Sequence, residues 1–318
     1  MDKIYIVGGG ASGMMAAIQA KTKDNEVILL EKNDRVGKKI LATGNGKCNL
    51  GNENLSVDCY YSKNGSFVEQ VLKRYDTESA VSFFASIGLK LRSKNGYLYP
   101  YAEQASVVLD VLRMELERRS IQVKPGVQIT DCTPLINKRG YLLKTPDGRS
   151  YEADRVILAC GGPASLKEGG KDGYNILQKL GLKTYPLVPG LVQLRTDGKE
   201  QKALSGVRCK ASLRLFADGI QQGSEQGELQ LTDYGISGIP VFQLSRVAAY
   251  ALRNRKSVMV QIDFTPEYSY DEIVTYLLEQ QNLRKDQTVD ELLTGFLNKK
   301  INLVFLKKCQ IAGNRMIE

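Results

Sequence analysis

The fold of this chain is decided by the stretch Ile4-Tyr5-Ile6-Val7-Gly8-Gly9-Gly10-Ala11-Ser12-Gly13. An apolar run leads into glycines with the spacing Gly8-x-Gly10-x-x-Gly13, and the apolar residues 14–18 then predict the start of a buried helix. A second apolar run, residues 27–30, ends in Glu31. This order of strand, glycine turn, helix, strand and acid is typical of a dinucleotide-binding unit.

Each chemical feature that such a unit needs has a candidate residue here. Gly8 permits the tight turn, Gly10 lets the backbone approach a pyrophosphate, and Gly13 lets helix and strand pack closely. The helix N-terminus offers free N–H groups and a partial positive charge to phosphate. Glu31 is placed to accept hydrogen bonds from ribose hydroxyls, so the site suits FAD or NAD rather than NADP. The alternative is a purely structural glycine turn, but the matching context on both sides favours the nucleotide.

Length and composition describe an ordinary globular protein. The chain has 318 residues, which predicts two or three structural units, and its hydrophobic content of 42% and charged content of 25% are average. No apolar run approaches the ~18 residues that cross a bilayer. The first strand begins almost at Met1, so we expect no leader segment, no membrane association and a cytoplasmic protein.

Cysteine and histidine usage restricts the chemistry. The six cysteines are scattered without a CxxC pair, so neither a zinc ribbon nor a paired redox centre is predicted. There is no histidine, so an acid–base step must use cysteine, tyrosine, lysine or a carboxylate, and no metal site is predicted. The net charge of +9 fits either a solvated basic surface or a polyanionic partner such as RNA.

The segment that follows Glu31, residues 32–49, is rich in glycine, lysine and asparagine and has neither a helical nor a strand period. Its glycines free the backbone for close approach, and Lys38, Lys39 and Lys47 are suited to meet phosphate. The alternative is a solvated basic loop. Its position directly after the ribose acid favours a cofactor loop.

Hydrophobic periodicity predicts the remaining elements of the first half. Thr77 is expected to cap the second helix and Gly88 to end it, and Asn95-Gly96 predicts a hairpin turn. An apolar strand that ends in Gly161-Gly162 is expected to point at the cofactor. Helices are predicted over residues 67–75, 80–87 and 104–119, and strands over 89–91, 97–99, 127–130, 141–144, 150–152 and 155–158.

A new unit is expected to begin near Pro186. Its first part favours strands and its last part favours helices. Strands are predicted at residues 192–194, 207, 212–216, 228–231 and 258–263, and helices over 241–252, 271–281, 289–298 and 303–310.

At this point the sequence resembles a known family. In chain order the motifs are Gly8 to Gly13, Glu31-Lys32-Asn33, Gly37-Lys38-Lys39, Thr43-Gly44-x-Gly46-Lys47-Cys48-Asn49, Tyr99-Pro100, Ala159-Cys160-Gly161-Gly162 and Leu231-Thr232-x-x-Gly235-Ile236-Ser237-Gly238. They are similar to those of the BaiN/RdsA family of FAD-dependent oxidoreductases, also called HI-0933-like flavoproteins. The likeness spans nearly the whole chain, and the TGxGKCN and TxxGISG motifs are far more specific than the glycine spacing.

The resemblance implies an α/β fold: a Rossmann-like FAD-binding domain of the two-dinucleotide-binding-domain flavoprotein type, with an inserted β-rich domain and a small helical domain. The expected boundaries are 1–187 for the FAD-binding domain, 188–265 for the β-rich domain and 266–318 for an incomplete helical subdomain. Related proteins continue into a closing FAD-binding segment that is absent before Glu318. We therefore expect an incomplete flavin site.

The resemblance also implies which residues contact FAD. Val127 lies where such folds contact the adenine, and Lys47 stands where family members often carry arginine. The implied FAD contacts are Gly8, Gly10, Ala11, Ser12, Gly13, Glu31, Lys32, Lys38, Thr43, Gly44, Gly46, Asn49, Val127 and Gly161.

The implied activity is reduction of an activated C=C bond with NAD(P)H as electron donor. Family members are linked to dihydrouridine formation in large-subunit ribosomal RNA and to reduction of bile-acid enones. The charge of +9 favours ribosomal RNA uridine as substrate. The alternatives are a small-molecule enone such as a 3-oxo bile acid, or a truncated, non-catalytic flavin-fold protein. Cys48, in the glycine-rich loop, is the candidate catalytic acid, and its alternative role is packing.

Overall fold

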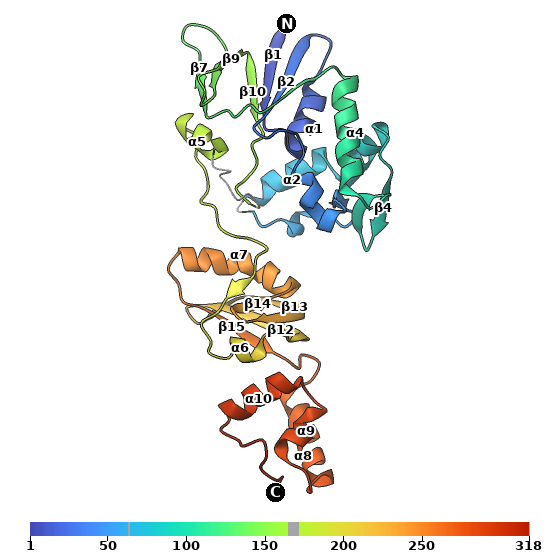
Figure 1. Cartoon of the computed structure of the whole chain (residues 1–318), viewed down its shortest axis with the longest axis vertical. Coiled ribbons are helices and arrows are strands. Elements are labelled where there is room, and N and C mark those ends of the chain that lie inside the picture. Colours follow the sequence, from blue (N-terminus) through green and yellow to red (C-terminus); the bar gives the residue numbers. More distant parts are fainter. Residues whose placement is uncertain (63, 165–171, 318) are drawn as a thin grey trace. The chain divides into compact units, whose positions relative to one another are not determined.

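The computed structural model of the chain describes residues 1–62, 64–164 and 172–317. It divides into two compact units, Met1–Tyr185 and Pro186–Glu318, each with its own core (Figure 1). No helix in these described ranges is both long enough and apolar enough to cross a membrane.

The first unit is built on a parallel four-stranded sheet in the order β10-β1-β2-β6. The central strand β1 is buried on both faces, as the unbroken apolar run of residues 4–7 predicts. Because all four strands run the same way, their carboxyl ends meet at one edge of the sheet. The strands are β1 (Asp2–Val7), β2 (Asn25–Glu31), β6 (Gln122–Pro125) and β10 (Arg155–Leu158).

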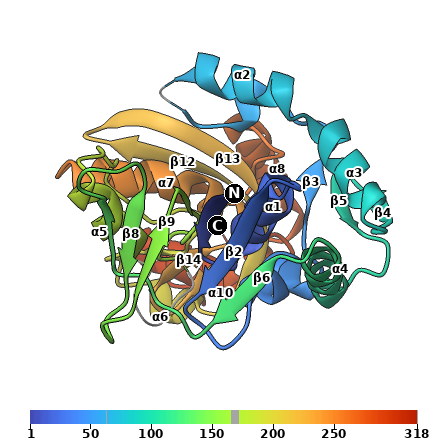
Figure 2. The ribbon, with the colours of Figure 1, turned by 90° about the horizontal axis from the view of Figure 1, so that it is seen from above.

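Alternate side chains of β1 enter two different hydrophobic cores, because successive residues of a strand point to opposite faces. Ile4 and Ile6 pack with helices α1 (Ala11–Ala20) and α4 (Ala105–Arg118). Tyr5 and Val7 pack with helix α5 (Asp172–Lys179) and a small antiparallel sheet. Figure 2 shows α4 and α5 on opposite sides of β2. The small sheet is β7 (Asp131–Pro134), β8 (Tyr141–Lys144) and β9 (Ser150–Ala153).

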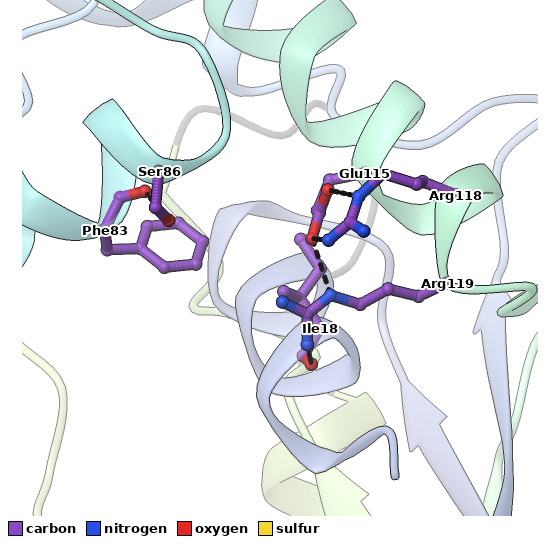
Figure 3. Close-up of polar contacts among 6 residues, drawn as sticks. All are labelled: Ile18, Phe83, Ser86, Glu115, Arg118 and Arg119. Atoms are coloured by element: carbon purple, nitrogen blue, oxygen red, sulfur yellow. Dashed lines mark hydrogen bonds and ion pairs between the residues drawn. The ribbon is translucent and has the colours of Figure 1, made fainter. Parts of the chain in front are cut away.

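An ion cluster around the buried Glu115 carboxylate links α4 to α1 (Figure 3). The Glu115 carboxylate, 5% exposed, accepts hydrogen bonds from Arg118 at 2.6 and 2.7 Å and from Arg119 at 2.6 Å. Arg119 also donates to the carbonyl oxygen of Ile18 at 2.9 Å, in the last turn of α1. A cation there complements the helix dipole. The hydrogen bonds from Arg118, and after them those from Arg119, lower the pKa of Glu115 to about 2.

The remaining elements of the first unit lie, in sequence, between β2 and α4. They include a second small sheet in the order β3-β5-β4. The elements are the 3-10 stretches η1 (Ile40–Gly46) and η2 (Val57–Cys59), helices α2 (Gly65–Arg74) and α3 (Thr77–Ser86), and strands β3 (Gly51–Asn52), β4 (Leu91–Lys94) and β5 (Tyr97–Pro100).

The second unit combines a five-stranded sheet, in the order β11-β14-β13-β12-β15, with helices. Helix α7 (Ile239–Arg253) packs on β12 and β13 through Val241, Leu244 and Ala248. The strands are β11 (Leu194–Arg195), β12 (Arg208–Ala217), β13 (Ile220–Thr232), β14 (Gly235–Ser237) and β15 (Val258–Asp263). The other helices are α6 (Gln201–Leu204), α8 (Tyr270–Leu283), α9 (Val289–Thr294) and α10 (Lys299–Lys308).

Two local predictions are wrong. Residues 127–130 form no strand; Gly126, at φ +70°, turns the chain after β6, and Val127 donates its N–H to the carbonyl of Glu31 instead. Asp76, not Thr77, caps α3, because its carboxylate accepts from the Ser79 N–H at 2.8 Å. The Thr77 hydroxyl donates to the carbonyl of Asn52, 2.9 Å away in β3.

Other segments also differ from expectation; strands β6 and β7 and helix α5, for example, lie where no such element is predicted. The segment 32–49 contains the 3-10 stretch η1, broken by non-helical backbone at residues 43–45, so it has some order despite its lack of period. Strand β14 was not predicted, because it has only three residues. Helix α9 ends at Thr294, with Gly295 as its C-cap, rather than at the predicted residue 298.

Candidate cofactor site

A cavity of about 400 Å³ opens at the carboxyl edge of the parallel sheet, where open α/β sheets bind their ligands. It gathers residues from connections that lie far apart in the chain. They come from the β1–α1 turn (Val7 to Ser12), the end of β2 and the following loop (Leu30, Glu31, Lys32, Asn33, Gly37, Lys38, Lys39, Ile40, Thr43), the segment Val127, Gln128 and Ile129, the segment Ala159, Cys160 and Gly161, and the start of α5 (Asp172, Gly173).

The glycines of the β1–α1 turn divide into two kinds. Gly8 and Gly13 are needed for close packing. A Cβ added to Gly8, which has φ +110°, would lie 2.4 Å from the Ala159 carbonyl oxygen, and a Cβ added to Gly13 would lie 1.8 Å from the Gly8 carbonyl oxygen. Gly10 differs, because a Cβ there would have no heavy atom within 4 Å in the described structure, although the residue lines the cavity. Helix α1 starts at Ala11 without a side-chain cap. This open, amide-rich corner fits the pyrophosphate of a dinucleotide.

Glu31 lies at the end of β2 with its carboxylate turned to the glycine turn. Its Oε2 accepts from the Gly9 N–H at 2.7 Å, and its Oε1 accepts from the Asn33 N–H at 2.8 Å and from the Asn33 side chain. A carboxylate has about four acceptor positions, so it retains capacity for ribose hydroxyls. The sequence predicted the ribose role but not this second one, in which Glu31 fastens the turn to β2.

The lysines of the cofactor loop separate into two groups. Lys38 pairs with Asp34 at 2.5 Å, and Lys39 donates to the Gly162 carbonyl at 2.9 Å, and both line the cavity. Lys47 does not belong to the lining. Its ammonium pairs instead with Glu103 at 2.6 Å, so the structure does not place it against the expected phosphate site.

The TGNGKCN motif contributes one residue, Thr43, to the cavity lining. Gly44 and Gly46 have φ of +54° and +82°, and a Cβ on Gly44 would lie 2.8 Å from the Asn49 nitrogen. These glycines shape the loop, and neither they nor Asn49 line the cavity. Their contact with FAD, like that of the other implied site residues, stays a prediction.

Two cysteines lie near this region in different surroundings. Cys48 is 6% exposed, packs in the core beneath α1 and α4, and is not part of the cavity lining. Cys160 does line the cavity, and its thiol donates to the Val7 carbonyl at 3.5 Å. Burial raises the pKa of the Cys160 thiol, so it stays protonated at neutral pH.

Sequence reasoning missed several lining residues, chiefly Gln128 and Asp172. The Gln128 side-chain amide donates to the Asp172 carboxylate at 3.0 Å, and Lys32 lies 3.8 Å from the same carboxylate. No local motif marks these residues, because they meet only when α5 packs over the sheet. Asn33 could have been found, since it directly follows the Glu31-Lys32 pair.

Comparison with known families agrees with this geometry. A family model described as the HI0933-like protein Rossmann domain matches residues 2–246, and one described as the HI0933-like protein barrel and H2TH domain matches residues 188–317. The chain belongs to the HI0933-like family. These matches confirm the predicted family and the Rossmann-like α/β fold with its β-rich and helical parts. Together with the curated reductase described below, they also confirm the predicted class of enzyme, a flavoprotein oxidoreductase. The two matches overlap, so the predicted domain boundaries stay a prediction.

Three curated relatives match across most of the chain. A 3-dehydro-bile acid delta(4,6)-reductase from Clostridium scindens is 40% identical, covering 99% of this chain and 77% of the relative. Ribosomal RNA dihydrouridine synthases from Haemophilus influenzae and Escherichia coli are 26% and 25% identical. Each covers 93% of this chain, which spans 72% and 71% of their respective lengths.

Proposed function

We propose that this HI0933-like protein is an FAD-dependent reductase that uses NAD(P)H to saturate a C=C bond conjugated to a ketone in a small molecule of the 3-oxo bile acid type. The observation that carries the proposal is the 40% identity to the Clostridium scindens reductase over 99% of the chain. The net charge of +9 by itself favours ribosomal RNA uridine as the substrate. The RNA-modifying relatives are only 26% and 25% identical, so the enone alternative now has the stronger support.

The cavity supports FAD as the cofactor through its nucleotide half. The amide groups at Gly10, Ala11 and Ser12 would hold the pyrophosphate, and Lys38 and Lys39 would add positive charge nearby. Glu31 would accept from the ribose hydroxyls. Bound FAD would supply the hydride chemistry that the chain's own side chains lack. The protein's own task is then to orient the substrate and supply a proton.

Saturation of an enone requires a proton at the carbon next to the carbonyl. The chain has no histidine, and Cys48 is the thiol that we propose as donor. Its competing role is packing, which its burial in the apolar core favours. A Cys48→Ala variant separates the two roles.

The test uses the purified chain after incubation with FAD. We expect a yellow protein that oxidises NADH or NADPH when given a 3-oxo-4,6-diene bile acid, with loss of the dienone absorbance. A large-subunit ribosomal RNA transcript is the parallel substrate. Loss of uracil absorbance with no turnover of the dienone would replace the proposal with the RNA alternative. Protein that stays colourless would refute FAD binding and favour the non-catalytic alternative.

A further inference from the structure

The carboxylate of Asp172 is the one acidic group from α5 in the cavity lining within the described residues. Its Oδ2 accepts from Gln128 Nε2 at 3.0 Å and lies 3.8 Å from Lys32 Nζ. Its Oδ1 accepts no hydrogen bond from residues 1–62, 64–164 or 172–317. Lys32 and Gln128 therefore hold the carboxylate through Oδ2, and within the described residues its Oδ1 is open to a ligand.

A series of hydrogen bonds fixes the spatial order of the cavity's lining segments, starting from the glycine turn. The bond from Gly9 N–H to Glu31 puts the ribose acceptor beside the pyrophosphate corner. The Val127 N–H donates to the Glu31 carbonyl at 2.9 Å, so the next segment begins beyond the end of β2. Gln128 then contacts Asp172. An ADP group has the same order of pyrophosphate, ribose and adenine.

This order puts the base against the segment 127–129 and Asp172. Val127 and Ile129 are buried apolar residues that line the cavity, so they offer a surface on which a flat ring can pack. An ionised carboxylate only accepts hydrogen bonds, and the 6-amino group of adenine is a donor. A purine with an oxygen at position 6 would place a second acceptor against the carboxylate, so no hydrogen bond would form there.

We propose that Asp172 is a specificity-determining residue that recognises adenine by accepting a hydrogen bond from its exocyclic 6-amino group, an inference that rests on the FAD site proposed above. Lys32 and Gln128 are positioning residues for this carboxylate. The cavity accordingly selects adenine nucleotides by an acidic side chain as well as by backbone and shape.

The test is titration calorimetry of the full chain, freed of flavin, with ADP and with purine riboside 5′-diphosphate, which lacks only the 6-amino group. We expect the wild-type protein to bind the analogue at least about tenfold more weakly, since a site built for a donor loses its partner. Asp172→Ala should bring the ratio of the two affinities close to one. Asp131→Ala is the matched control, because Asp131 pairs with Lys179 of α5 at 2.8 Å outside the cavity lining and should leave the ratio unchanged.

Equal binding of the two nucleotides by the wild-type protein would overturn the assignment, whether or not the variant folds. A ratio that survives in Asp172→Ala would overturn it as well. If the wild-type protein binds neither nucleotide, the dinucleotide site itself is refuted and this assignment falls with it. The first two results would leave the FAD site standing, so the two failures are distinguishable.

Discussion

Replacement of Glu115 by glutamine removes the charge at the centre of the α1–α4 ion cluster while it keeps the side-chain shape. In the native structure the carboxylate, 5% exposed, holds both Arg118 and Arg119, and Arg119 in turn binds the carbonyl of Ile18. We expect Glu115→Gln to destabilise the first unit, because the buried amide cannot pair with two guanidinium groups and loosens the link to α1.

The size of this effect follows from the pKa of Glu115, which falls from 4.5 to about 2 on folding. Without solvent screening, a pKa difference of that size corresponds to ~3 kcal/mol in the free energy of unfolding at neutral pH. Arg118 is 68% exposed, so solvent screens part of the interaction. We therefore expect a loss of about 1–2 kcal/mol in the free energy of unfolding at neutral pH.

The stabilising contribution of Glu115 decreases as the pH falls. Because folding lowers the pKa of this carboxyl, its contribution is complete above the unfolded value of 4.5 and is lost as pH falls towards about 2. The difference in stability between wild type and Glu115→Gln should thus be constant near neutral pH and shrink below 4.5.

Urea denaturation followed by circular dichroism measures this difference. Asp110→Asn is the matched control: Asp110 lies on the same helix and pairs with Arg113 at 3.8 Å, but its side chain is 64% exposed. We expect it to cost less than about 0.5 kcal/mol. If Glu115→Gln is no more destabilising than Asp110→Asn, or if its effect does not diminish in acid, the reasoning is refuted.

The remaining predictions concern the turn and the thiols. Gly13→Ala should unfold the first unit or lower its melting temperature markedly, because the added Cβ would clash with the Gly8 carbonyl. Gly10→Ala should retain the fold and weaken FAD binding at least about tenfold, as measured by flavin fluorescence. Equal effects of the two substitutions would contradict the division of the glycines into two kinds. If Cys48 supplies the proton, Cys48→Ala should lower turnover about 10²-fold with FAD still bound, and full turnover would rule the role out. Hydrogen bonds from Ser56 lower the pKa of the exposed Cys59 thiol, so iodoacetamide should alkylate it well before buried Cys132, as mass spectrometry would show.

Much of the first unit follows from short-range patterns. The run of residues 4–13 predicted a strand, a tight turn and a helix, and the structure has β1, the turn and α1 in that order. In the second unit, the prediction of residues 258–263 as a strand matches β15 residue for residue. By contrast, residues 127–130 are predicted as a strand, although Val127 and Ile129 cover a core without joining a ladder.

The sequence alone determined the dinucleotide unit, because glycine's access to positive φ, hydrophobic periodicity and the acid after β2 act over a few residues. Which charged side chains meet depends instead on how distant segments fold together. The sequence predicts Lys47 as a phosphate ligand, but in the fold its ammonium pairs with Glu103. No sequence pattern predicts Asp172 as a site residue, but α5 places it beside Gln128 in the cavity. An electrostatic partner is chosen by distance and burial, and both depend on how distant segments pack.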